Sequence, residues 1–105
     1  MSPKQEIAER RAVYRVPLNL PVRVVDAQSQ WIDGETRDVS PGGFLLFISK
    51  SLIPGSEVEY VVSVPDFRSV KLRCVGRVLR SADFAGGGSE VAVSMEGCSP
   101  FEAEL

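Results

Sequence analysis

The sequence contains no histidine, the side chain that most often serves as a general base, as part of a nucleophilic triad or as a metal ligand. Only two cysteines occur, Cys74 and Cys98, and they have neither CxxC spacing nor a neighbouring histidine. We therefore expect no structural zinc site, no bound metal and no cofactor. Asp33, Glu35 and Asp38 could supply paired carboxylates, but nothing in the sequence positions a second catalytic group, so we expect no enzymatic activity.

Long hydrophobic runs are also missing. No apolar stretch approaches the roughly 20 residues of a membrane-spanning helix, and Lys4, Glu6 and Glu9 stand where a signal peptide would have its apolar core. These features predict a cytoplasmic protein that does not insert into membranes. The net charge of −2 and the pI of about 5.1 argue against attraction of the whole surface to nucleic acid or an anionic membrane. Any anion-binding site must be local.

The chain is long enough for one domain and too short for two. Its 105 residues are 44% hydrophobic and 25% charged, which is the balance of an ordinary globular protein with a modest core. Residues 1–9 show weak periodicity and mixed charge. We therefore expect a flexible N-terminal tail over 1–9 and a single domain over 10–105.

Apolar and polar residues alternate with a period of two along most of the domain, which predicts strands. Pro17 and Pro21 interrupt the first apolar segment, residues 13–25, and cannot donate to a ladder, so this segment should be a bent or edge strand. Five further strands are expected at residues 31–39, 44–48, 57–64, 70–78 and 91–95. The predicted fold class is all-β, a six-stranded antiparallel β-barrel that is closed or nearly closed.

Local signals add detail to this prediction. Asp33-Gly34 indicates a turn or a bulge inside the second strand, and Ser40-Pro41-Gly42-Gly43 indicates a hairpin connection. Ser99-Pro100-Phe101-Glu102 places serine at an N-cap and proline at the first helical position, so a short C-terminal helix start is expected. Trp31 and Met95 are interpreted as packing residues.

The first cluster of candidate binding residues is Arg10-Arg11-Ala12-Val13-Tyr14-Arg15, between the tail and the first strand. Guanidinium groups form bidentate hydrogen bonds with phosphate oxygens and stack on purine faces. Three of them within six residues suit a ligand that has phosphates and flat bases. The alternative is a solvated patch near Glu6 and Glu9, which is what most such clusters are.

The second cluster is Asp38-Val39-Ser40-Pro41-Gly42-Gly43, at the end of a predicted strand. Asp38 and Ser40 should project to the same side, where both can accept hydrogen bonds from guanine N1–H and N2–H or from a backbone amide. Gly42 and Gly43 leave room for a ligand to approach the backbone. The alternative is a routine turn, because these residue types are the ones that turns use. Strand alternation favours Arg37 on the face opposite Asp38.

Together the two clusters resemble the signature of a known family. Arg11-x-x-x-Arg15 followed by Asp38-x-Ser40-x-x-Gly43 is similar to the two-part motif of PilZ domains, and the resemblance covers the chain from Glu9 onward. It implies a six-stranded antiparallel barrel that binds the bacterial second messenger cyclic di-GMP and has no catalytic activity. It also implies a cytoplasmic regulator of motility or biofilm formation.

The resemblance assigns a role to each motif position. Arg11 and Arg15 would contact guanine edges, stacked base faces or phosphates. Asp38 and Ser40 would accept hydrogen bonds from guanine, and Gly43 would keep the surface open to the ligand.

The resemblance also bears on stoichiometry and partners. Arg10 occupies the position that, in similar domains, goes with a stacked pair of ligand molecules, so we expect two ligands per chain. Ordering of the arginine segment over the barrel would change the surface that an unidentified effector protein meets. The sequence leaves both a monomer and a homodimer open.

Two other functions deserve comparison. A ligand-independent adaptor of the PilZ type, in pilus or motility assemblies, is the main alternative, but such an adaptor would be free to lose the motif residues, and here they are intact. A nucleic-acid-binding barrel would show a basic stripe with interleaved aromatics on one strand face. The acidic balance and the buried character of Phe44-Leu45-Leu46-Phe47 disfavour a nucleic-acid partner.

Overall fold

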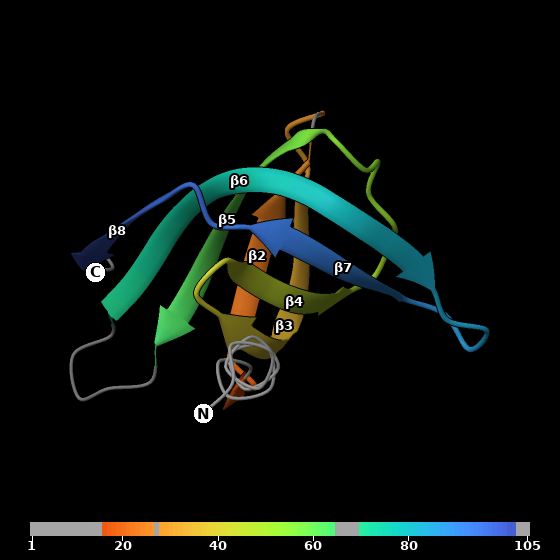
Figure 1. Ribbon diagram of the computed structural model, residues 1–105, viewed down its shortest axis with the longest axis horizontal. Coiled ribbons are helices and arrows are strands. Elements are labelled where there is room, and N and C mark those ends of the chain that lie inside the picture. The colour runs from red at the N-terminus through yellow and green to blue at the C-terminus, as the bar shows by residue number, and fades with distance from the viewer. Residues whose placement is uncertain (1–15, 27, 65–69, 103–105) are drawn as a thin grey trace, which may run out of the picture.

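The structure, a computed structural model, describes residues 16–26, 28–64 and 70–102 (Figure 1). These residues contain strands and connections and no helix. The strands are β1 (Val16–Pro17), β2 (Pro21–Val25), β3 (Trp31–Ser40), β4 (Gly43–Ile48), β5 (Glu57–Val64), β6 (Val70–Asp83), β7 (Ser89–Ser94) and β8 (Gly97–Glu102). The predicted tail, residues 1–9, lies outside the described residues.

Six strands form a closed antiparallel ring in the order β3-β2-β5-β6-β7-β4, and β4 pairs with β3 to complete it. The ring confirms the predicted barrel. Two short strands lie outside it, because β1 pairs only with the end of β3, and β8 pairs with the first half of β6. In Figure 1, β6 arches over the barrel, with β8 beside its start and β7 beside its end.

The core follows from the alternation of side chains along each strand. Inward positions carry mainly β-branched and aromatic side chains, which pack well on a pleated surface. The rings of Phe44 and Tyr60 meet edge to face, with centroids 5.7 Å apart. Met95 is half-buried against this core, in line with its interpretation as a packing residue. The core residues are Val22, Val24, Ile32, Phe44, Leu46, Ile48, Val58, Tyr60, Val62, Cys74, Val78, Val91 and Val93.

The predicted helix start at residues 99–102 is wrong, because these residues belong to β8. Ser99 pairs with Arg73 and Pro100 with Leu72. The first half of β6 has β5 on one side only, and β8 supplies hydrogen-bond partners to its other edge. Proline is tolerated because β8 is an edge strand.

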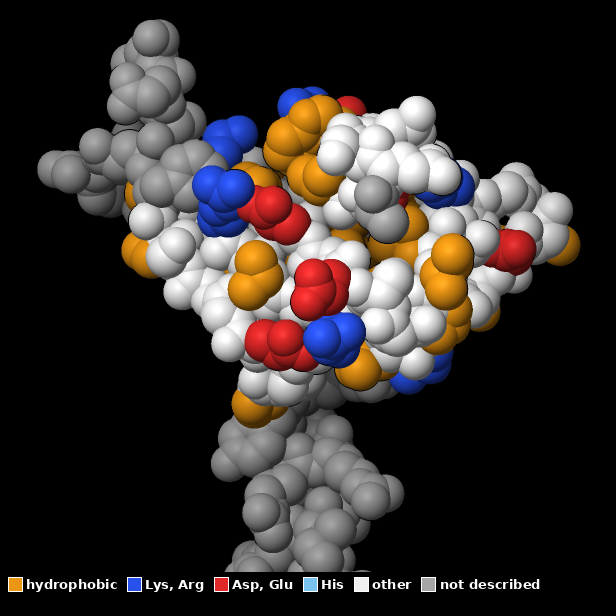
Figure 2. All heavy atoms as spheres, turned by 90° about the horizontal axis from the view of Figure 1, so that it is seen from above, with side chains coloured by type: hydrophobic (Ala, Val, Ile, Leu, Met, Phe, Trp, Pro, Cys, Tyr) orange, Lys and Arg blue, Asp and Glu red, His pale blue; other side chains and the backbone are white. Residues whose placement is uncertain are grey.

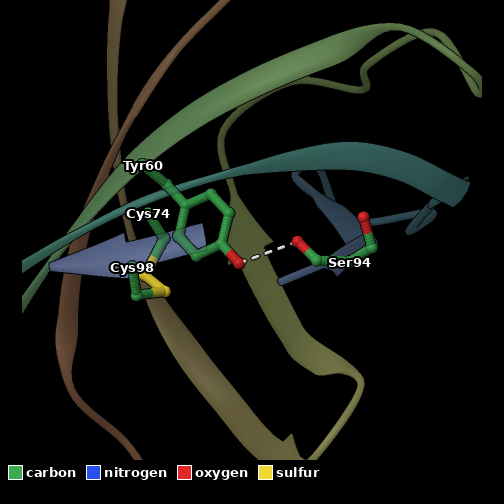
Figure 3. Close-up of a disulfide and its surroundings, with 4 residues drawn as sticks. All are labelled: Tyr60, Cys74, Ser94 and Cys98. Carbon is green, nitrogen blue, oxygen red and sulfur yellow. Dashed lines mark hydrogen bonds between the residues drawn. A yellow bond between two sulfur atoms is a disulfide. The ribbon is translucent and has the colours of Figure 1, made fainter. Parts of the chain in front are cut away.

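A disulfide joins the two strands. Cys74 in β6 and Cys98 in β8 are directly opposite each other, with Cα atoms 4.1 Å apart (Figure 3). Nearby, the Tyr60 hydroxyl donates a hydrogen bond to the Ser94 carbonyl oxygen. The sequence analysis considered these cysteines only as metal ligands, and their pairing across two strands is a feature that it did not predict.

Asp33-Gly34 is neither a turn nor a bulge, which corrects the sequence prediction. Gly34 lies in the continuous part of β3, opposite Val22 on one side and Ile48 on the other. A Cβ atom at this position would lie closer than 3.0 Å to the Phe47 carbonyl oxygen and to the Ile48 side chain. Glycine is therefore needed here so that β3 and β4 can approach each other closely.

Candidate binding surface

The β3–β4 hairpin carries the second predicted motif. Ser40 pairs with Gly43 across a two-residue turn, Pro41-Gly42, as the sequence indicated. The Ser40 hydroxyl donates to the Gly43 carbonyl oxygen at 3.4 Å. A second bond anchors the turn, since the backbone N–H of Met95, the residue after β7, donates to the Gly42 carbonyl oxygen at 2.9 Å.

A β-bulge decides which way the motif faces. Thr36 pairs with Leu46, but the next paired residue of β3 is Asp38, which lies opposite Leu45, so Arg37 is the extra residue. Without the bulge, the period of two would turn Asp38 inward, because Thr36 is buried in the barrel. The register therefore places Asp38 and Ser40 together on the outer face of the barrel. Asp38 and Ser40 are both half-buried there.

Thr36 holds the bulge in place. Its hydroxyl accepts a hydrogen bond from the backbone N–H of Leu20 at 2.9 Å and donates one to the carbonyl oxygen of Leu18. The backbone N–H of Leu18 in turn donates to the carbonyl oxygen of Arg37 at 3.0 Å. These bonds attach the segment between β1 and β2 to β3 just before Asp38, and they satisfy a buried polar side chain.

Gly43 meets a packing requirement that is independent of any ligand. A Cβ atom here would lie much closer than 3.0 Å to the Val93 carbonyl oxygen, a backbone atom that cannot easily move. Nothing lies within 4 Å of a Cβ atom built at Gly42. The role that the sequence analysis gave Gly43, keeping the surface open, stays a prediction.

Strand β1, which directly follows the arginine motif in the sequence, pairs with the end of β3. Val16 pairs with Val39, and Pro17 pairs with Asp38. Arg15 is one peptide bond before Val16 in the sequence, so the first described residue after the arginine motif lies beside the part of β3 that carries Asp38 and Ser40. The other motif arginines, Arg10 and Arg11, lie with Arg15 outside the described residues, and their contacts stay predictions.

Arg37 does not point to the face opposite Asp38, as strand alternation favoured. It is exposed, and its guanidinium carbon lies 4.8 Å from the centre of the Phe47 ring. Phe47 in turn packs against Phe84, with centroids 5.4 Å apart. Because Arg37 is the extra residue of the bulge, the alternation rule does not apply to it.

Trp31 is on the outer surface, and its expected role in packing is wrong. Its side chain is 59% exposed, and its ring lies 5.6 Å from the guanidinium carbon of Arg23. Arg23 also forms an ion pair with Asp33 at 2.7 Å. This pair holds the pKa of Asp33 below its ordinary value, mainly through the hydrogen bond from Arg23.

A second bulge lies in β6. Val78 pairs with Val93, but the next paired residue is Arg80, which lies opposite Ala92. The buried positions Cys74, Gly76 and Val78 would put Arg80 inward without this shift. The bulge instead turns Arg80 outward, where it is exposed. Sequence reasoning missed Arg80, since a period of two contains no signal for an extra residue.

The two bulges align residues from four strands in one outward row. Asp38 lies opposite Leu45, Leu45 opposite Ala92, and Ala92 opposite Arg80. Opposite residues in antiparallel pairs share a face of the sheet. The row therefore has an acidic end, two apolar members in the middle and a basic end.

Charges elsewhere on the described surface are largely paired. Ion pairs join Lys50 to Asp26 at 2.8 Å and Arg73 to Glu59. On the face shown in Figure 2, side chains of both signs lie close together, without a large area of one sign. Among the described residues, no ion pair involves Arg37 or Arg80.

The structure has other features that bear on function. A hollow of about 140 Å³ is lined by Asp26, Gln28, Lys50, Ser51, Leu52, Ile53, Ser56, Glu57 and Val58, none of which belongs to either motif. Within the described ranges, no group of three or more acidic, cysteine or histidine side chains is arranged to hold a metal ion. No helix in the part of the chain that the structure describes is long and apolar enough to cross a membrane.

The fold and the surface define a class, the small closed β-barrel with candidate ligand-binding residues on the outside of one hairpin. The family model of the PilZ domain matches residues 9–100, and the chain belongs to this family. The match confirms the resemblance seen in the sequence. No curated protein shows a significant match to the chain.

Proposed function

We propose that this PilZ domain binds cyclic di-GMP on the outer face of the β3–β4 hairpin. The observation that carries the proposal is the pairing of β1 with the end of β3. Val16 and Pro17 lie opposite Val39 and Asp38. The segment that directly follows the arginine motif in the sequence therefore lies beside the second motif, although the two motifs are more than 20 residues apart in the sequence.

The chemistry of the two motifs is complementary to this ligand. Cyclic di-GMP has two guanine bases with N–H donors and two phosphates that carry negative charge. Asp38 and Ser40 supply outward-facing acceptors for the guanine donors. Arg11 and Arg15 supply guanidinium groups for phosphates, base edges and base faces. Since part of the attraction is between charges on the surface, affinity should fall as salt is raised.

Arg10 supports a stacked pair of ligand molecules. A guanidinium group can stack on a base and form hydrogen bonds at its edge at the same time. With Arg11 and Arg15, it provides three such groups in six residues. We therefore expect two ligands per chain, and an Arg10→Ala variant should bind one.

A regulatory consequence follows from the place of the arginine segment in the sequence, directly before β1. Binding would fix that segment over the hairpin and present a different surface to an effector protein. The ordering cost subtracts from the ligand affinity. The ligand should therefore raise the affinity for any protein that recognises the ordered segment, and that protein should raise the affinity for the ligand by the same factor.

Isothermal titration with cyclic di-GMP tests the proposal. Wild-type protein should bind with micromolar or tighter affinity, with GTP as the control ligand that does not reproduce this binding. An Arg11→Ala, Arg15→Ala double variant and an Asp38→Ala variant should each lose at least tenfold, since hydrogen bonds to charged groups are worth about 1.5–3 kcal/mol. The matched control is Arg73→Gln, which removes an arginine from the outer surface of β6.

Absence of heat at excess ligand, together with no thermal stabilisation, would contradict the proposal. That result would favour the ligand-independent adaptor, and the search would turn to protein partners.

A further inference from the structure

Arg80 has no role in either predicted motif, yet the barrel places it in the same outward row as Asp38. The three cross-strand pairs of this row are Asp38 with Leu45, Leu45 with Ala92, and Ala92 with Arg80. Both charged ends depend on a bulge, one in β3 and one in β6. Without those bulges, the period of two would direct both side chains into the core.

The middle of the row is a low apolar shelf. Leu45 is half-buried, and Ala92 is 8% exposed and has only a methyl group. A flat base can lie on such a surface, whereas a phosphate placed there would lose hydration without gaining hydrogen bonds. The shelf therefore favours the face of a base over a phosphate group.

The length of the row suits one guanine. Neighbouring strands are about 4.8 Å apart, so the three steps from Asp38 to Arg80 cover about 14 Å. An arginine side chain is long enough to cover part of this distance. A guanine that lies on Leu45 and Ala92 would turn its N1–H and N2–H donors toward Asp38 and its O6 and N7 acceptors toward the other end.

The Arg80 side chain is suited to the second edge. It is exposed, and among the described residues no ion pair or side-chain hydrogen bond engages it. The diagonal neighbour Glu90 makes no ion pair with it in this part of the chain. By contrast, the guanidinium of Arg37 already lies on the Phe47 ring. A guanidinium fork forms two hydrogen bonds with guanine O6 and N7.

We propose that Arg80 is a further ligand-binding residue, which binds the O6 and N7 edge of the guanine whose opposite edge Asp38 recognises. The assignment rests on the proposed function, because it needs the same ligand in the same place. It makes Arg80 a determinant of specificity for guanine over adenine, since adenine replaces the O6 acceptor with an amino donor.

Titration of Arg80→Gln, Arg80→Lys and the control Arg73→Gln with cyclic di-GMP tests this role. Arg80→Gln should weaken binding roughly 5- to 150-fold, the range for a bidentate base contact, with unchanged thermal unfolding of the free protein. Arg80→Lys should rescue little, because an ammonium group has no fork. The control is Arg73→Gln, which should bind like wild type, because Arg73 lies in the first half of β6 and pairs with Glu59 of β5.

A ligand analogue with 7-deazaguanine bases, in which C–H replaces N7, identifies the contact. Wild type should bind this analogue several-fold more weakly than cyclic di-GMP, and Arg80→Gln should bind both equally. The role of Arg80 would be overturned if the analogue weakened binding equally in wild type and Arg80→Gln, or if Arg80→Gln bound cyclic di-GMP with wild-type affinity. In either case, binding that still depends on Asp38 would leave the proposed function intact. Full rescue by Arg80→Lys would overturn the guanine contact in favour of a phosphate. No binding by the wild type would overturn both proposals.

Discussion

Tyr60 and Ser94 are joined across the inside of the barrel, where the tyrosine hydroxyl donates a 2.9 Å hydrogen bond to the serine carbonyl oxygen. The Tyr60 side chain is fully buried. Burial, and to a lesser extent the charge of Glu96, raise the pKa of Tyr60 well above its ordinary value. The folded protein therefore keeps this hydroxyl protonated under conditions in which an exposed tyrosine ionises.

This relationship predicts a loss of stability at alkaline pH. The unfolded chain releases the Tyr60 proton at about pH 10, whereas the folded chain keeps this proton at that pH. The stabilisation is complete below that pH, and the free energy of unfolding should fall as the pH rises above it. Tyr60→Phe should cost about 1–3 kcal/mol at neutral pH, because it leaves a buried carbonyl unpaired, and should decline less steeply in alkali.

Urea denaturation at neutral pH and near about pH 11 checks this prediction. Tyr14→Phe is the matched control, since Tyr14 is the other tyrosine of the chain. Equal alkaline declines in wild type and Tyr60→Phe would show that Tyr60 is not responsible.

Gly43→Ala should destabilise the barrel, and Gly42→Ala should not. A methyl group at position 43 would collide with the Val93 carbonyl oxygen, whereas position 42 has open space around it. We expect a cost of about 1–3 kcal/mol or more for Gly43→Ala and a change within about 0.5 kcal/mol for Gly42→Ala. Thermal unfolding of the two variants measures the difference, and similar melting temperatures would refute it.

Thr36→Val should be costly although the side chain keeps its shape. The valine leaves the Leu20 N–H and the Leu18 carbonyl oxygen without their buried partner. A loss of about 1–3 kcal/mol is expected, while Thr36→Ser, which keeps the hydroxyl, should recover most of it. Urea denaturation of both variants distinguishes a hydrogen-bonding role from simple packing, which would make serine the worse substitution.

Reduction of the Cys74–Cys98 disulfide should lower stability and release β8. The bond joins two residues with a sequence separation of 24. By restricting the unfolded chain, a disulfide that closes a loop of this length raises the free energy of unfolding by about 3 kcal/mol. Denaturation with and without reductant measures the loss, and hydrogen exchange at the backbone amides of residues 97–99 reports the release. The Cys74→Ala, Cys98→Ala double variant should not respond to reductant, and a wild type that also failed to respond would contradict the prediction.

The sequence predicted the strands of the ring because their side chains follow a period of two. Tyr60 and Val62 in β5, or Val91 and Val93 in β7, face the core as their spacing indicates. The candidate motifs were recognised in another way, by residue types and spacing that resemble a family signature. Periodicity is a local property and can be read without knowing the partner strand.

The parts that were missed depend on contacts between distant segments. Each bulge adds a residue on one strand relative to its partner, which is visible only when the two strands are aligned. Ser99 satisfies a local rule for a helix start, but the backbone around it pairs with β6 instead, and a local rule contains no information on that distant partner strand. The pairing of Cys74 with Cys98 likewise follows from the register of β6 and β8.

The bulges also determine which changes the chain tolerates at these points. A substitution of Arg37 changes one exposed side chain. Deletion of Arg37 would remove the extra residue and exchange the inward and outward positions in the end of β3. The Asp38 carboxylate would then point toward the apolar interior. Deletion of Leu79 would do the same to Arg80. At these two positions a change in chain length should therefore be more damaging than a change of residue, because a one-residue deletion would turn a proposed binding side chain inward without mutating it.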